Sequence, residues 1–115
     1  MITATGITTE NQIKTDLDLN TADLSAYKWT WIDFENPTTE EVQHLKDTFH
    51  FHPLAIEDCL QLLQRPKLDY YEGYTFYVTH HVHTEQKKIV KVELDFFAAV
   101  NFILTFHSVS SKAVQ

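Results

Sequence analysis

The sequence is poor in cysteine, arginine and glycine: among 115 residues it has one cysteine, one arginine and two glycines. A lone cysteine, Cys59, can form neither a disulfide within the chain nor a zinc cluster built on several thiolates. The two glycines, Gly6 and Gly73, are too far apart to build a loop that cradles phosphates. These absences argue against a disulfide-stabilised scaffold and against the common nucleotide-binding loops.

Long apolar runs and positive charge are also scarce. No stretch approaches the ~18 apolar residues of a membrane span, and the polar first twenty residues lack the apolar core of a secretion signal. Nine Lys and Arg residues stand against 16 Asp and Glu residues, for a net charge of −7. Nucleic-acid affinity comes mainly from Lys and Arg, so this balance disfavours nucleic acid and anionic membranes and suits cations better.

The residues of a nucleophilic enzyme are missing as well. The few serines lie at positions 25, 108, 110 and 111, and none is part of a nucleophile elbow. Cys59 falls on an apolar helical stripe, where we expect a buried and unreactive thiol. We therefore expect no enzymatic activity from this chain.

What is present predicts one globular domain with mixed secondary structure, because 43% of the residues are hydrophobic and 13% aromatic. Residues 1–26 read as a poorly specified lead-in, with an edge strand possible through Ile13, Leu17 and Leu19. A strand is predicted over 27–34, ended by Asn36-Pro37. A capping-box pattern from Thr38 to Glu41 predicts a helix over 38–50, and Pro53 opens a second helix that extends to Pro66.

The second half of the chain predicts strands. They cover 68–71, 74–82, 89–97 and 102–106, with a turn at Glu72-Gly73. The order predicts an α+β fold, similar to an α/β/α sandwich, in which helices pack on a mixed, largely antiparallel sheet. Its second face would need to be covered by chain beyond residue 115.

Seven histidines raise the question of a metal site. His81 and His83 are two apart on a predicted strand, so both point to one face and could offer two imidazoles to Zn²⁺. No third ligand follows at a recognisable spacing, so the half-exposed face of a hairpin is the favoured interpretation of this pair. His80 points to the opposite face of that strand. The other four histidines are scattered and fit surface, cap or turn positions: His44, His50, His52 and His107.

Glu57 and Asp58 form an acidic ridge on the second predicted helix, about 100° apart around its axis. Mg²⁺ prefers six oxygen ligands and keeps several waters, so partner carboxylates would have to come from elsewhere or from another subunit. The simpler alternative is a solvated first turn of a helix, where the helix dipole stabilises carboxylates. The basic cluster from Arg65 to Lys67 fits a helix end, with cations near the last carbonyl groups.

Several blocks together resemble one family, the CorA-type magnesium transporters. The order and spacing of the blocks match the N-terminal cytoplasmic domain of that family over about residues 27–107. The blocks are Trp31-Ile32-Asp33, Asn36-Pro37, Phe51-His52-Pro53-Leu54-Ala55-Ile56-Glu57-Asp58, Gln64-Arg65-Pro66-Lys67 and Tyr71-Glu72-Gly73-Tyr74.

The resemblance implies a cell-membrane protein of which this part lies on the cytoplasmic side. In the family the domain precedes a long helix, two membrane helices and a Gly-Met-Asn motif, in a homopentamer. None of those elements occurs here, so the resemblance implies a truncated cytoplasmic domain that ends over 108–115 and meets the membrane only through missing helices.

The resemblance also implies a role for the acidic ridge. Regulatory cation sites of the family use acidic residues after the His-Pro-Leu block, which here are Glu57 and Asp58, with partner carboxylates from the adjacent subunit. The implied ligand is Mg²⁺, or Co²⁺ or Ni²⁺, and less readily Zn²⁺, and its binding would regulate ion influx. A related Zn²⁺ transporter and a stand-alone soluble interaction domain remain as alternatives.

Overall fold

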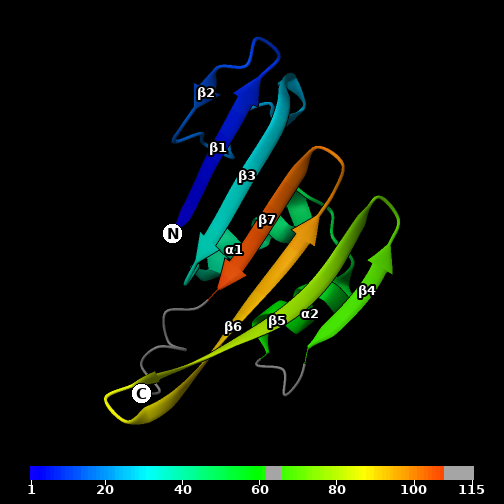
Figure 1. Ribbon diagram of the computed structural model, residues 1–115. Helices are drawn as coiled ribbons and strands as arrows, with labels where there is room; N and C mark the ends of the chain where they lie inside the picture. The colour runs from blue at the N-terminus through cyan, green and yellow to red at the C-terminus, as the bar shows by residue number, and fades with distance from the viewer. Residues whose placement is uncertain (62–65, 108–115) are drawn as a thin grey trace.

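The computed structural model describes residues 1–61 and 66–107, and for 81–85 and 88–92 it describes the backbone alone. These residues form one sheet with two α-helices on one of its faces (Figure 1). The elements are β1 (Ile2–Thr8), β2 (Ile13–Lys14), a 3-10 turn η1 (Leu24–Ala26), β3 (Tyr27–Glu35), α1 (Thr39–Asp47), α2 (Pro53–Leu60), β4 (Lys67–Tyr71), β5 (Tyr74–Glu85), β6 (Lys88–Ala98) and β7 (Phe102–His107).

The sheet has the strand order β2-β1-β3-β7-β6-β5-β4. Strand β7 runs parallel to β3, while the other neighbouring pairs of the described sheet are antiparallel. The predicted α+β fold with a mixed, largely antiparallel sheet is therefore confirmed. The predicted strands of the second half are present, and each observed strand extends its predicted range by one to three residues.

The N-terminal segment differs from its prediction. Strand β1 pairs with β3 from Ile2 opposite Phe34 to Thr8 opposite Tyr27, so it is an inner strand of the sheet. Its buried positions, Ala4 and Gly6, are small, so the segment lacks the alternation of large apolar residues by which strands are predicted. The predicted edge strand is limited to Ile13–Lys14, whereas Leu17 and Leu19 pack against the core outside any strand.

Both helices start as predicted and end earlier. At α1 the capping box is complete, because Glu41 N donates to Thr38 Oγ1 and Thr38 N donates to Glu41 Oε1. Helix α2 ends at Leu60, since Gln61 is already extended with φ −109° and ψ 144°. The prediction that this helix reaches Pro66 is therefore wrong, and Leu63 of its predicted stripe lies outside the described residues.

The core lies between the helices and the sheet. Phe51, just before α2, stacks on Phe97 of β6 with ring centroids 3.9 Å apart. Leu45 of α1 and Ala55 of α2 are fully buried against the same face of the sheet. The other buried apolar residues of this core are Ala4, Ile32, Phe34, Cys59, Phe76, Val78, Leu104 and Phe106.

The opposite face of the sheet is uncovered by helices in the described part of the chain (Figure 1). It carries Trp29 and Trp31 on β3, with Trp31 50% exposed, and a stacked pair formed by Tyr77 and Phe96. Within the described residues no helix has the length and apolar character to cross a membrane. The described residues therefore form two layers, with aromatic side chains on the open side.

Candidate functional site

The His-Pro-Leu block fixes where helix α2 begins. The ring nitrogen Nδ1 of His52 accepts a hydrogen bond from Leu54 N at 3.1 Å, so His52 caps the helix, and Pro53 occupies the first turn as predicted. The backbone N–H of His52 donates to the Tyr74 hydroxyl at 2.7 Å, and the His52 ring stacks on Tyr71. The start of α2 is thereby tied to the turn between β4 and β5.

The acidic ridge consists of Glu57 and Asp58 of α2, of which Glu57 is exposed and Asp58 is partly buried. Glu57 Oε1 accepts a hydrogen bond from Gln61 Nε2 at 3.2 Å. The Asp58 side chain is only 15% exposed, and its Oδ2 accepts a hydrogen bond from Lys67 Nζ at 2.6 Å. The structure therefore places Lys67 against the ridge, a contact that helical spacing alone could not indicate.

Lys67 bridges two carboxylates. Its ammonium group lies 2.6 Å from Asp58 of α2 and 3.2 Å from Asp69, two residues further along the same strand β4. The hydrogen bond to Asp58, followed by that to Asp69, raises the pKa of the Lys67 ammonium group. Lys67 thus pairs with two carboxylates and not, as predicted, with the last carbonyl groups of the preceding helix. Arg65, the other cation of the predicted cluster, lies outside the described residues.

The ridge can contribute carboxylate oxygens to a cation but cannot enclose one alone. Across the described side chains, no three His, Cys, Asp or Glu residues are grouped so that they could hold a metal ion. A hard divalent cation on the ridge would need further oxygens from water or from another chain, and it would compete with Lys67 for Asp58. The side chains of His81 and His83, the other candidate pair, lie outside the described residues.

A second group of polar side chains lies beneath α2, where the sequence analysis had predicted only a buried thiol and a strand. Asp95 and Glu93 of β6 are buried, with Cys59 of α2 and His80 of β5 beside them. Burial, and then the charge of Glu93, raise the pKa of Asp95 to about 9. Burial likewise raises the pKa of the Cys59 thiol well above its usual value, which agrees with a buried, unreactive cysteine.

A third polar group joins β3 and β7 on the open face of the sheet. Thr105 Oγ1 donates to Asp33 Oδ1 at 2.5 Å, and His107 Nε2 lies 3.1 Å from the same oxygen. Trp31 Nε1 donates to Thr105 Oγ1 at 3.2 Å. This network links the one parallel strand pair of the described sheet through side chains, so its evident role is structural.

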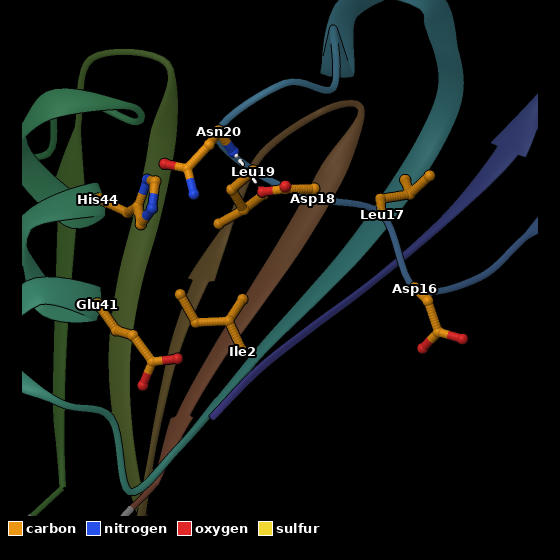
Figure 2. Close-up of a pocket in the computed structure, with 8 residues that line it drawn as sticks. All are labelled: Ile2, Asp16, Leu17, Asp18, Leu19, Asn20, Glu41 and His44. Carbon is orange, nitrogen blue, oxygen red and sulfur yellow. Dashed lines mark hydrogen bonds between the residues drawn. The ribbon is translucent and has the colours of Figure 1, made fainter.

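A polar pocket of about 340 Å³ lies between α1 and the loop that precedes η1. Figure 2 shows the residues that line it. Glu41 and His44 lie on one side of it, and Asp16 lies on the opposite side (Figure 2). Asp18 accepts a hydrogen bond from Asn20 N at 2.9 Å, and Glu41 belongs to the capping box of α1. Two of the acidic residues of this pocket, Asp18 and Glu41, thus hold the local backbone.

Comparison with known proteins identifies the family. The family model described as "CorA-like Mg2+ transporter protein" matches residues 27–115, which is more than half of the chain. The chain is 46% identical over 107 residues to YfjQ of Bacillus subtilis (strain 168), which carries a provisional name as a metal ion transporter. It is 36% identical over 77 residues to the cobalt/magnesium transport protein CorA of Thermotoga maritima.

The matches cover most of this chain but only part of those relatives. They span 93% of this chain and 33% of YfjQ, and 66% of this chain and 21% of the Thermotoga protein. The chain therefore corresponds to a third or less of the length of these two transporters.

Solved structures share the fold. The complete CorA magnesium transporter of Methanocaldococcus jannaschii superimposes with a TM-score of 0.75 at 20% identity, over 99% of this chain and 34% of that one. The soluble domain of the same protein superimposes with a TM-score of 0.75 at 23% identity, over 99% of this chain and 43% of that one. The full-length CmaX protein superimposes with a TM-score of 0.67 at 17% identity, over 98% of this chain and 36% of that one. The family match, together with this shared fold, shows that the chain belongs to the CorA-like Mg²⁺ transporter family.

Proposed function

We propose that this chain is the cytoplasmic, Mg²⁺-sensing part of a CorA-like transporter, with Co²⁺ as a second cation. The membership of a transporter family, rather than of an enzyme family, supports this function. The names of two relatives, which describe transport of metal ions and of cobalt and magnesium, suggest the cations. The observation that carries the proposal is the acidic ridge, with Glu57 exposed three residues after Leu54 of the His-Pro-Leu block.

The ridge acts as half of a cation site. Glu57 and Asp58 supply carboxylate oxygens, and the adjacent subunit of a homopentamer supplies the remaining protein ligands, because Mg²⁺ needs more oxygens than one ridge can offer. Without Mg²⁺, Lys67 neutralises Asp58; with Mg²⁺, Lys67 keeps its second partner, Asp69, 3.2 Å away. This alternative partner lowers the cost of releasing Asp58 to the metal.

An apolar groove beside the ridge supports a neighbouring surface at this place. The groove has a volume of about 370 Å³ between α1 and α2, and Glu57 lies on its wall together with Val42, Ile56 and Leu60. Leu60 and the nearby Leu54 are both more than half exposed. Apolar surface next to a carboxylate fits an interface in which the partner covers the groove and completes the cation site.

Bound Mg²⁺ then regulates transport by feedback. The cation offsets repulsion between the acidic faces of adjacent subunits and holds the assembly in its closed state. When Mg²⁺ falls, the carboxylates repel one another and the subunits shift toward a conducting state. The cation thus changes the population of two arrangements because it binds one of them better.

Limited proteolysis of the full-length transporter in membranes tests this proposal. In the parent protein, Mg²⁺ should slow cleavage of the cytoplasmic part. Glu57→Ala combined with Asp58→Ala should require at least about tenfold more Mg²⁺ for the same protection, equivalent to about 1.4 kcal/mol of lost binding free energy.

The matched control is Glu40→Ala combined with Asp47→Ala, which removes two exposed carboxylates from α1 instead. We expect that control to be protected at the parental Mg²⁺ concentration. If the ridge variant is protected at that same concentration, Glu57 and Asp58 are only a solvated face of the helix, and the proposal fails.

A further inference from the structure

Two acidic side chains of β6, Glu93 and Asp95, are buried beneath helix α2. Glu93 is 8% exposed and Asp95 is 1% exposed. Because they are two residues apart on a strand, both side chains leave the sheet on the face that the helices cover. Their carboxyl groups lie within hydrogen-bonding reach of each other. We call these two residues the acid pair.

The acid pair cannot carry two negative charges at low cost. Two carboxylates in one buried site repel each other, so one of them stays neutral over a wide range of pH. Asp95 Oδ1 has no hydrogen-bond partner in the described part of the chain. An unpartnered buried oxygen costs far less free energy on a neutral carboxyl than on a carboxylate. Asp95 is therefore the member of the pair that holds the proton.

Among the described side chains of the neighbouring strands, one titratable group lies near the pair. On β5, Val78 lies opposite Asp95, and His80 lies opposite Glu93 with its Nε2 3.4 Å from Glu93 Oε1. On β7, the residue opposite Asp95 is Phe106. Glu93 thus has a polar neighbour across the sheet, whereas Asp95 is flanked there by apolar side chains.

Helix α2 closes the site from above. The Cys59 thiol lies within hydrogen-bonding reach of Asp95, and the Asp58 carboxylate is near enough to disfavour a charge there. Ala55 and Cys59 are the buried residues of this helix. The surface by which α2 packs on the sheet is therefore the same surface that keeps water from Asp95.

We propose that the acid pair binds one proton at neutral pH and that this proton keeps helix α2 docked on the sheet. When the proton leaves to solvent, a second negative charge forms beneath Cys59 and is repelled by Glu93 and Asp58. Hydration of that charge requires the helix to move away. The proposal holds whether or not Glu57 and Asp58 bind a cation.

One consequence does rest on the proposed function: because α2 carries Glu57 and Asp58, the ridge would lose its position when the proton leaves. Proton loss and metal binding would then be linked through one helix. The experiments below use no metal, so they test the proton site separately from the cation site.

Carbon-13 NMR of the side-chain carboxyl groups tests the proton directly in the 115-residue chain. Over a titration from about pH 3 to about pH 11, we expect one carboxyl carbon of the acid pair to change with a midpoint above pH 7, and Glu93→Gln to lower the midpoint of Asp95. Midpoints of both carboxyls near pH 4, the ordinary range for Asp and Glu, would overturn the proposal.

Hydrogen exchange of the α2 backbone amides tests the coupling. Protection, corrected for the intrinsic effect of pH, should fall at least about tenfold above the high midpoint in the parent, which corresponds to about 1.4 kcal/mol. Asp95→Asn should keep its protection there, because the amide cannot ionise yet still donates a hydrogen bond to Glu93. Asp47→Asn, which alters an exposed carboxylate of α1, should behave as the parent. Protection that stays constant in the parent, or falls equally in Asp95→Asn, would overturn the coupling.

Discussion

Single residues decide the details that patterns of residue type do not show. Helical spacing predicts that Glu57 and Asp58 are adjacent on one helix. It could not show that Lys67, nine residues after Asp58, returns from strand β4 to pair with it, since that contact depends on the path of the chain. Asp95 was equally hidden, because an acidic residue that alternates with apolar ones reads as the exposed side of a strand.

Gly6 of β1 is another such residue. A Cβ atom at this position would lie 2.6 Å from Cδ1 of Tyr27, well inside van der Waals contact. The tyrosine ring thus fills the space that a side chain would need. A glycine in a threonine-rich segment gave no sign of this packing, which is one reason why the strand was missed.

We predict that Gly6→Ala lowers the free energy of unfolding by about 1–3 kcal/mol, because the new methyl group overpacks against Tyr27. Urea denaturation of the 115-residue chain measures the change. In a Tyr27→Ala background the same substitution should cost much less, since the ring is gone. An equal cost in both backgrounds would show that the clash is not the cause.

At the scale of elements, local signals predicted where helices begin better than where they end. Thr38 with Glu41, and His52 with Pro53, are caps whose hydrogen bonds are made within a few residues. Helix α2 ends without a comparable local signal, so its predicted length was wrong. The strands of the second half were predicted well because each carries a run of aromatic and β-branched residues.

The capping box of α1 provides a test at this scale. Thr38→Ala removes the hydroxyl that accepts from Glu41 N, so it should lower the free energy of unfolding by about 1 kcal/mol, within the usual range of 0.5–2 kcal/mol. Urea denaturation measures the loss, and hydrogen exchange should place it at the start of α1. Thr39→Ala, one residue further on, is the control and should cost less; an equal loss in both variants would argue against the cap.

At the scale of the whole molecule, the pattern of elements predicted the fold class correctly, but the order of the strands depends on long-range contacts. The predicted order of strand, two helices and several strands correctly implied helices packed on a mixed sheet. It did not specify that β7 inserts between β3 and β6, because no local residue pattern encodes a neighbour some 70 positions away along the chain. Nor could one chain reveal ligands that a second subunit would supply.

The raised pKa of Asp95 has a consequence for the stability of the whole domain. The folded chain binds this proton more tightly than the unfolded chain, whose Asp pKa is about 3.9. The stability conferred by the proton is therefore complete below about pH 4 and is lost as the pH rises toward about 9, by up to about 1.4 kcal/mol per pH unit.

We predict that Asp95→Asn flattens this decline. Urea denaturation at a series of pH values measures the free energy of unfolding of both proteins. As the pH rises from neutral toward about 9, this free energy should fall less in the variant than in the parent. Parallel curves for the two proteins over that interval would contradict the prediction, because they would mean that the Asp95 carboxyl titrates alike in the folded and unfolded chains.

The place of β7 bears on how the domain forms during synthesis. Before residue 102 leaves the ribosome, β2-β1-β3 and β6-β5-β4 can exist only as two separate half-sheets, and each exposes an unpaired inner edge, on β3 and on β6. Such edges readily pair with other chains. Six residues, Phe102–His107, close both edges at once and join the halves, so the nascent domain is open to misassembly until they emerge and is protected from it afterwards.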